Sequence, residues 1–203
     1  MYIPKPFQLT DEQILYQVIQ EHGFAILISD DQTAPTATHL PLMISEDRTY
    51  LHGHFARANP QWKGLENKKV LAIFQGPHCY ISPSWYETNR AVPTWNYVAV
   101  HVYGELEFLE EQELHESLNE LVAQYEKSDS CYQLDQVDEE FVAGLAKGVV
   151  GFRIKINTIE GTAKLSQNHS MERVKRVINE LEKSTSENEQ QVAQWMRTYN
   201  RLD

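Results

Sequence analysis

A succession of short, strand-like segments joined by brief links is the feature that most limits the fold of this chain. Apolar or alternating segments suited to strands span 24–29, 37–45, 49–56, 68–76, 79–84, 96–109 and 148–161. The last of them alternates Phe152, Ile154 and Ile156 with polar neighbours, as a half-buried strand does. Because most of these segments follow one another without an intervening helix, they predict an antiparallel β-barrel rather than a doubly wound parallel sheet.

Helical patterns interrupt this run instead of alternating with it, so the predicted class is mainly β with helices. Helices are expected at about 10–22, 60–66, 110–126, 138–147, 171–183 and 187–199. The helix at 60 would be capped by Asn59 and begin at Pro60. We expect one domain over residues 1–165, with residues 166–203 forming a C-terminal helical hairpin extension packed on it.

Charged residues are distributed unevenly along the chain, and their distribution bears on whether the chain binds nucleic acid. Net charge is −11, and the stretch from Glu105 to Glu140 holds 13 carboxylates against one lysine, Lys127. Such a run is typical of a solvated helical face. Nucleic-acid surfaces need the opposite sign, because their affinity comes mainly from Lys and Arg. Direct DNA binding is therefore only weakly supported by the charge.

The cellular compartment can be inferred from targeting and membrane features that the sequence lacks. No apolar run approaches the roughly 20 residues that a membrane helix needs, and the first residues resemble neither a signal nor a transit peptide. The two cysteines, Cys79 and Cys131, have no CxxC spacing, which favours reduced thiols. We expect a cytoplasmic protein that does not contact a membrane.

The stretch LHGHFARANPQW, residues 51–62, gathers polar groups at the end of a predicted strand. His52 and His54 would share one face of the strand, but no third ligand is marked, so no metal site is predicted. Arg57 and the backbone N–H groups before Pro60 could form an anion site. A capped turn with a solvated arginine explains the same residues equally well.

Two further stretches stand out. Residues 80–97 combine two prolines with two tryptophans and three tyrosines, which suits a loop folded over the core, an aromatic-walled pocket or a subunit interface. Residues 161–170 form a polar turn that offers donors to a phosphate, although a simple helix approach explains it too. Nucleophile, zinc and nucleotide-loop motifs are absent from the sequence, so no catalytic residue is assigned.

Taken together, five motifs in order resemble the PaiB family of FMN-binding negative transcriptional regulators. They are HLPL (39–42), GHFARANPQW (53–62), YISPSWY (80–86), VPTWNY (92–97) and KLSQN (164–168). The resemblance implies a split β-barrel like that of pyridoxamine-phosphate oxidases, with FMN held in clefts between the two subunits of a homodimer. One departure is His169, where the family pattern more often has Arg or Lys.

The resemblance also implies roles for particular residues. Arg57, Ala58 and Asn59 would hold the FMN phosphate, and His39, with one of His52 or His54, would line the same cleft. The flavin pocket would be shaped by Trp85, Pro93, Thr94, Trp95 and Asn96 and closed by Lys164, Ser166 and Gln167, the last three from either chain of the dimer.

Three functions fit this resemblance. The first is a regulator that binds FMN, or a similar flat phosphorylated ligand, and represses protease production and sporulation, directly or through a partner. The second is a flavin-dependent oxidoreductase of the pyridoxamine-phosphate-oxidase type. The third is a structural dimer that has lost the cofactor. The regulator is favoured.

Overall fold

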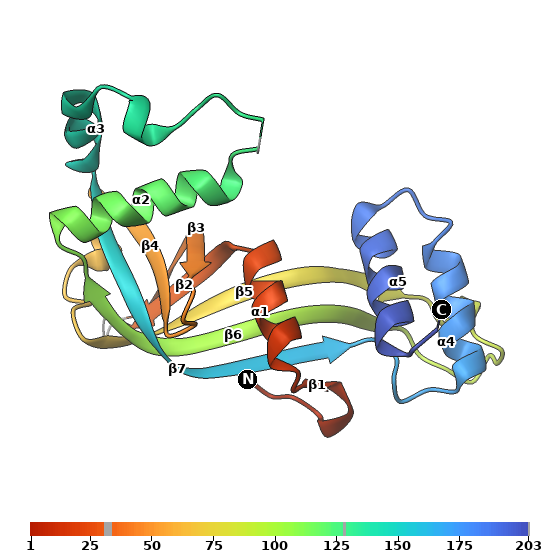
Figure 1. The fold of residues 1–203 in the computed structure, drawn as a ribbon. Coiled ribbons are helices and arrows are strands. Elements are labelled where there is room, and N and C mark those ends of the chain that lie inside the picture. Colours follow the sequence, from red (N-terminus) through yellow and green to blue (C-terminus); the bar gives the residue numbers. More distant parts are fainter. Residues whose placement is uncertain (31–33, 128, 203) are drawn as a thin grey trace. The chain divides into compact units, whose positions relative to one another are not determined.

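The computed structural model describes residues 1–30, 34–127 and 129–202 (Figure 1). The strands are β1 (Gln8–Leu9), β2 (Phe24–Asp30), β3 (Pro35–Ile44), β4 (Tyr50–Ala56), β5 (Lys68–Ile81), β6 (Thr94–Phe108) and β7 (Val149–Lys164). The α-helices are α1 (Glu12–Glu21), α2 (Glu111–Tyr125), α3 (Glu139–Ala146), α4 (Met171–Leu181) and α5 (Glu187–Tyr199). Short 3-10 helices occur at Lys5–Phe7, Pro60–Trp62, Pro83–Trp85 and Leu134–Gln136.

The strands pair in the order β1-β7-β4-β3-β2-β5-β6, and β6 also pairs with β7. This extra pairing closes β2 to β7 into a ring, and β1 lies outside it on β7. The pairs whose register is defined are all antiparallel. Closure removes the open edges that an antiparallel sheet would otherwise expose.

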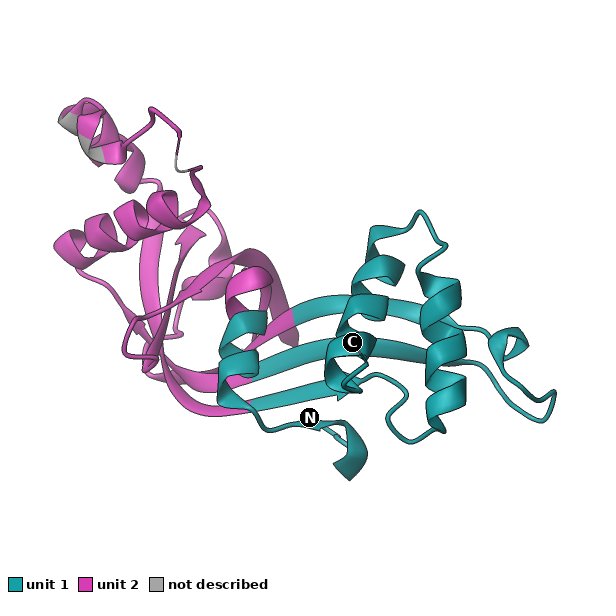
Figure 2. Ribbon diagram, turned by 45° about the vertical axis from the view of Figure 1, so that its right-hand side comes forward, with its two compact units in different colours: residues 1–18, 75–101, 160–203 teal, residues 19–74, 102–159 magenta. Residues whose placement is uncertain are grey.

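The residues cluster into two compact units, shown in Figure 2. Unit 1 holds residues 1–18, 75–101 and 160–203, and unit 2 holds residues 19–74 and 102–159. Strands β5, β6 and β7 contribute residues to both units. The expected division at residue 165 stays a prediction.

The core of unit 2 follows from the two-residue period of its strands. In β4, Leu51, Gly53 and Phe55 are buried, while the histidines between them are half-buried. The Phe55 ring lies 4.8 Å from that of Phe152 on β7. A side chain at Gly53 would collide with Leu42 and Phe152, which is why glycine fits there.

In unit 1 the helical hairpin forms because α4 carries one apolar stripe. Val174, Val177, Ile178 and Leu181 recur at helical spacing and are all buried, and α4 packs against α5. The Ser170 hydroxyl caps α4 by accepting a hydrogen bond from the Arg173 backbone N–H at 3.3 Å.

Two expectations about local structure are wrong. The helix predicted at 60–66 is only the 3-10 turn Pro60–Trp62, because Lys63 is extended and Gly64 adopts a positive φ of 78°. The segments at 68–76 and 79–84 are largely one strand, β5, which continues through Pro77. Strand φ values are compatible with proline, so the Gly76-Pro77 pair does not end it.

None of the described helices is long and apolar enough to cross a membrane. Cys79 is buried, Cys131 is exposed, and both are free thiols. Burial raises the pKa of the Cys79 thiol to about 12, so it is unreactive at neutral pH.

Candidate functional site

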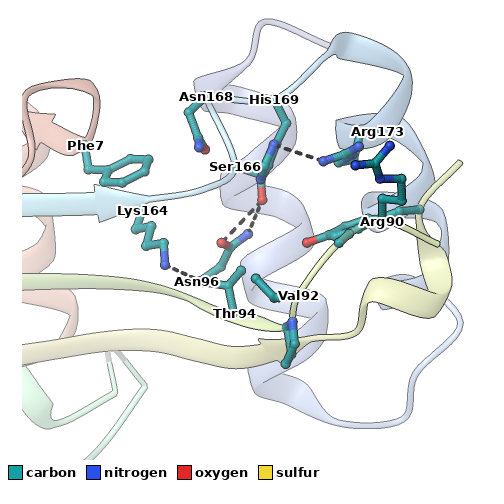
Figure 3. Close-up of a pocket in the computed structure, with 13 residues that line it drawn as sticks. Phe7, Arg90, Val92, Thr94, Asn96, Lys164, Ser166, Asn168, His169 and Arg173 are labelled. Carbon is teal, nitrogen blue, oxygen red and sulfur yellow. Dashed lines mark hydrogen bonds between the residues drawn. The ribbon is translucent and has the colours of Figure 1, made fainter. Parts of the chain in front are cut away.

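A cavity of about 380 Å³ lies within unit 1 and is called here the unit 1 pocket (Figure 3). Its volume lies in the range of about 300–1,000 Å³ that is usual for small-molecule sites. Figure 3 shows Phe7 and Lys164 on one side and Arg90 and Arg173 on the other. The lining residues are Phe7, Tyr86, Arg90, Ala91, Val92, Pro93, Thr94, Asn96, Lys164, Ser166, Asn168, His169 and Arg173.

One side of the pocket is built by strand pairing. β1 pairs with β7 through Gln8 opposite Thr162, which brings the preceding residue, Phe7, towards the end of β7. The Lys164 ammonium lies 5.9 Å from the centre of the Phe7 ring and donates a hydrogen bond to the Thr94 hydroxyl. The contacts with Phe7 and Thr94 therefore hold Lys164 at the pocket.

The floor of the pocket is a buried polar pair. The Asn96 side chain is fully buried and donates to Ser166 Oγ at 3.0 Å and to Met196 Sδ of α5 at 3.4 Å. Ser166 adopts a φ of +65°, a left-handed conformation that is uncommon outside glycine. Such backbone persists only where surrounding contacts enforce it and is frequent at ligand sites. The pair fixes the turn that follows β7.

Arg173 organises the other side of the pocket. Its guanidinium contacts both carboxylate oxygens of Glu87, the shorter contact being 2.6 Å, and lies 4.6 Å from the centre of the Tyr86 ring. Hydrogen bonding to Arg173 lowers the pKa of Glu87 to about 2, so this carboxylate is ionised at neutral pH. Arg173 also faces His169 Nδ1 at 3.4 Å.

His169 is neutral at physiological pH. Burial and then the charge of Arg173 lower its pKa below the ordinary value for histidine. Because the guanidinium can only donate, His169 Nδ1 accepts and its Nε2 carries the proton. The imidazole thus supplies hydrogen bonding rather than charge at this position.

The pocket is lined by more positive than negative side chains, and this charge indicates which ligands it can bind. Glu87 balances Arg173, but no carboxylate among the described residues forms an ion pair with Arg90 or Lys164. A phosphate group and a flat, partly polar ring match this lining of cations, aromatic rings and amide or imidazole groups. The residues present therefore fit a flavin mononucleotide.

Five of the residues singled out from the sequence lie together at this pocket. Pro93, Thr94 and Asn96 come from the start of β6 and the loop before it, and Lys164 and Ser166 from the end of β7 and the following turn. Within this group, Thr94 is bonded to Lys164 and Asn96 to Ser166.

Three other predicted residues of unit 1 do not line the pocket. Trp95 alternates to the opposite face of β6, is 53% exposed and contacts the rings of His78 and Tyr80. Trp85 lines a separate surface cavity beside α4. The Gln167 side chain bonds to the backbone of its own turn, accepting from Leu165 N at 2.7 Å and donating to the Ala163 carbonyl.

The remaining predicted residues belong to unit 2. The Arg57 guanidinium donates to the carbonyls of Lys147 at 2.6 Å and Val149 at 2.7 Å. Asn59 caps the 3-10 turn by accepting from Gln61 N at 2.9 Å, and Ala58 is exposed. His39, on β3, has a tilted ring contact with Phe24. Their role in binding remains a prediction.

The histidine pair of β4 also lies in unit 2. Burial lowers the pKa of both His52 and His54, and Glu120 approaches His52 Nδ1 to 3.8 Å. Across the described part of the chain, no group of three His, Cys, Asp or Glu side chains is placed to hold a metal ion.

The assignments from sequence missed several lining residues. Phe7 and Arg90 carried no local signal, because one depends on a two-residue strand pairing and the other is a single charge in a loop. Tyr86, His169 and Arg173 lie within or beside the noticed motifs, but nothing in their spacing marks the contacts among them.

Comparison with known proteins identifies a matching family model and a closely similar relative. A family model described as "Putative FMN-binding domain" matches residues 1–158. The chain is 42% identical over 200 residues to the "Protease synthase and sporulation protein PAI 2" of Bacillus subtilis, covering 97% of this chain and 96% of that protein.

Solved structures share the fold at low identity. The flavocytochrome Anf3 of Azotobacter vinelandii matches with a TM-score of 0.58 and 12% identity, over 77% of this chain and 69% of that chain. A "putative 5-nitroimidazole antibiotic resistance protein" of Bacteroides thetaiotaomicron matches with a TM-score of 0.57 and 16% identity, over 76% and 85%. With the antiparallel ring of strands, these matches confirm the predicted split-barrel class.

Proposed function

The chain belongs to the PaiB family, characterised by an FMN-binding domain, and from this premise we propose that it binds FMN, or a similar flat phosphorylated ligand, in the unit 1 pocket. The observation that carries the proposal is the pair of cations, Arg90 and Lys164, at a cavity that also offers aromatic and hydrogen-bonding groups.

Each group has a distinct task in this proposal. Lys164 and Arg90 attract the phosphate, and Arg173, held by Glu87, keeps a fixed orientation. The Asn96–Ser166 pair holds the turn in place, so the pocket is formed before the ligand arrives. FMN, when bound, would supply hydride and single-electron transfer, while the protein supplies binding and orientation.

A visible spectrum of the purified protein, followed by titration with FMN, tests the proposal. We expect flavin absorbance that is shifted from that of free FMN and saturates at one FMN per chain. A colourless protein that leaves the spectrum of added FMN unchanged would refute it and would favour a dimer that has lost the cofactor.

As an alternative position of the phosphate, we propose the junction residues Arg57, Ala58 and Asn59 of unit 2, and this alternative can be tested separately. If the phosphate binds there, Arg57→Ala weakens FMN affinity by more than tenfold, through loss of a charge-assisted contact of about 1.5–3 kcal/mol, whereas a phosphate in the unit 1 pocket leaves the affinity of this variant nearly unchanged. The measurement is a fluorescence titration, with the exposed Lys63→Ala as a control for net charge. Unchanged affinity in Arg57→Ala would remove Arg57 from the site.

We also propose that the protein is a cytoplasmic homodimer. The exposed apolar side chains of unit 1 include Tyr80 at 45%, Trp95 at 53% and Val92 at 76%. Exposed aromatic surface of this kind is typical of subunit interfaces.

Light scattering at micromolar concentration is expected to give the mass of a dimer. Trp95→Asp should raise the dissociation constant at least about tenfold, because it places a charge on the apolar surface. Tyr2→Asp, at a side chain 87% exposed elsewhere in unit 1, should have no such effect. A wild-type monomer would contradict the proposal.

For the cell, we propose a negative regulator of protease production and sporulation, the processes named for the B. subtilis relative. Repression through a partner is favoured over direct DNA contact, because the chain is acidic and two α4 cations, Arg173 and Arg176, are paired with Glu87 and Glu172.

Two assays separate the proposed functions. Salt-dependent, sequence-selective retention of a protease promoter fragment would establish direct repression. Reduction of bound flavin by NAD(P)H, followed by turnover with an acceptor, would instead establish the oxidoreductase.

A further inference from the structure

Tyr86 lines the unit 1 pocket, and its hydroxyl group is buried without a hydrogen-bond partner among the described residues. The residue as a whole is 9% exposed. A hydroxyl removed from water and left unpaired is destabilising, and such groups are rare in folded proteins. The unpaired hydroxyl therefore calls for a partner that the chain itself does not supply.

The ring that carries this hydroxyl is fixed from one side. Arg173 lies over it at 4.6 Å and is itself held by Glu87, while the His169 ring lies 6.0 Å away. Contacts of this kind restrict the movement of the Tyr86 ring and so of the hydroxyl that it carries. Its position is set in advance rather than adopted on binding.

The surrounding charges indicate what the partner is. Arg90, Lys164 and Arg173 line the same pocket and favour an anion. Burial raises the pKa of Tyr86, so the phenol keeps its proton at neutral pH and can donate it in a hydrogen bond. An anionic oxygen accepts such a bond more strongly than a neutral one does.

We propose that the Tyr86 hydroxyl donates a hydrogen bond to a phosphate oxygen of the ligand and thereby makes the pocket prefer phosphorylated over unphosphorylated flavins. The identity of the ligand as a flavin rests on the function proposed above. The assignment of a phosphate-binding role to Tyr86 rests on the buried hydroxyl and the three cations alone.

The test compares FMN with riboflavin on the wild type and on Tyr86→Phe. The variant keeps the ring beneath Arg173 and removes one oxygen atom. We expect FMN affinity to fall about tenfold or more, because the lost bond has a charged acceptor, while riboflavin affinity changes by less than about twofold. The matched control is Tyr2→Phe, a phenol 87% exposed that does not line the pocket.

A melting curve without ligand excludes misfolding as the cause. Removing an unsatisfied buried hydroxyl is expected to raise the melting temperature of Tyr86→Phe by about 2 °C. Lower affinity for FMN in a variant at least as stable as the wild type is the signature of a group kept for binding.

The outcomes separate this inference from the proposed function. If the wild type binds FMN and Tyr86→Phe binds it equally well, or loses FMN and riboflavin affinity alike, the role of Tyr86 is overturned while FMN binding stands. If the wild type binds no FMN, the role of Tyr86 is tested instead by the effect of inorganic phosphate on the melting temperature. A phosphate-induced rise in melting temperature that Tyr86→Phe loses supports the inference, and its absence in the wild type, or its persistence in the variant, overturns it.

Discussion

Lys164→Gln is expected to weaken FMN binding by about ten- to a hundredfold, since a charge-assisted hydrogen bond contributes about 1.5–3 kcal/mol. Lys164 has no carboxylate partner among the described residues and lies against Phe7 and Thr94 at the unit 1 pocket. Glutamine keeps a donor for the Thr94 hydroxyl but removes the charge. A fluorescence titration at two salt concentrations measures the loss.

The matched control for Lys164 is Lys175→Gln, an exposed residue of α4 outside the pocket. It makes the same change in net charge and should leave the affinity nearly unchanged. The difference between the two variants should shrink as salt is raised, because screening weakens the contribution of an accessible charge. Equal affinities of Lys164→Gln and the wild type would place the phosphate elsewhere.

Gly104→Ala is expected to lower the free energy of unfolding by about 2–3 kcal/mol. Within unit 2, a Cβ at Gly104 would lie 2.4 Å from the Lys155 carbonyl oxygen and 2.5 Å from Ile154 Cγ2. Because β6 and β7 pair, this carbonyl belongs to the sheet and cannot turn aside as a flexible side chain would. The strands would have to separate.

Urea unfolding at a fixed protein concentration measures this change. Gly144→Ala on α3 is the control, since nothing lies within 4 Å of its added Cβ. There alanine should raise the free energy of unfolding by up to about 1 kcal/mol, because it favours helix over glycine. A Gly104→Ala protein as stable as the wild type would mean that β6 and β7 do not approach this closely.

The fold was predictable where local patterns control it. Alternation in the last strand was a sufficient guide, and Phe152 and Ile154 are indeed fully buried. N-terminal caps could also be predicted, since Asn59 does cap the 3-10 turn that begins at Pro60. The length of individual helices and strands was harder to predict. The positive φ of Gly64 ends one helix after a single turn, whereas Pro77 does not end β5. Proline and glycine indicate which φ values the backbone can adopt at their positions, but they do not by themselves show whether a helix or strand ends there.

The pocket was predictable only in part, for a related reason. Thr94, Asn96, Lys164 and Ser166 stand in short motifs, so the sequence already groups them. Phe7 arrives through a pairing between residues more than 150 positions apart, which no local pattern reveals. The unpaired Tyr86 hydroxyl is visible only when every neighbouring atom is placed.

A crystal structure of the protein grown with FMN tests the central claim most directly. The account predicts FMN in unit 1, with a phosphate oxygen within about 3 Å of both Lys164 Nζ and the Tyr86 hydroxyl. FMN bound with its phosphate away from both residues, and the unit 1 pocket filled only by solvent, would contradict it.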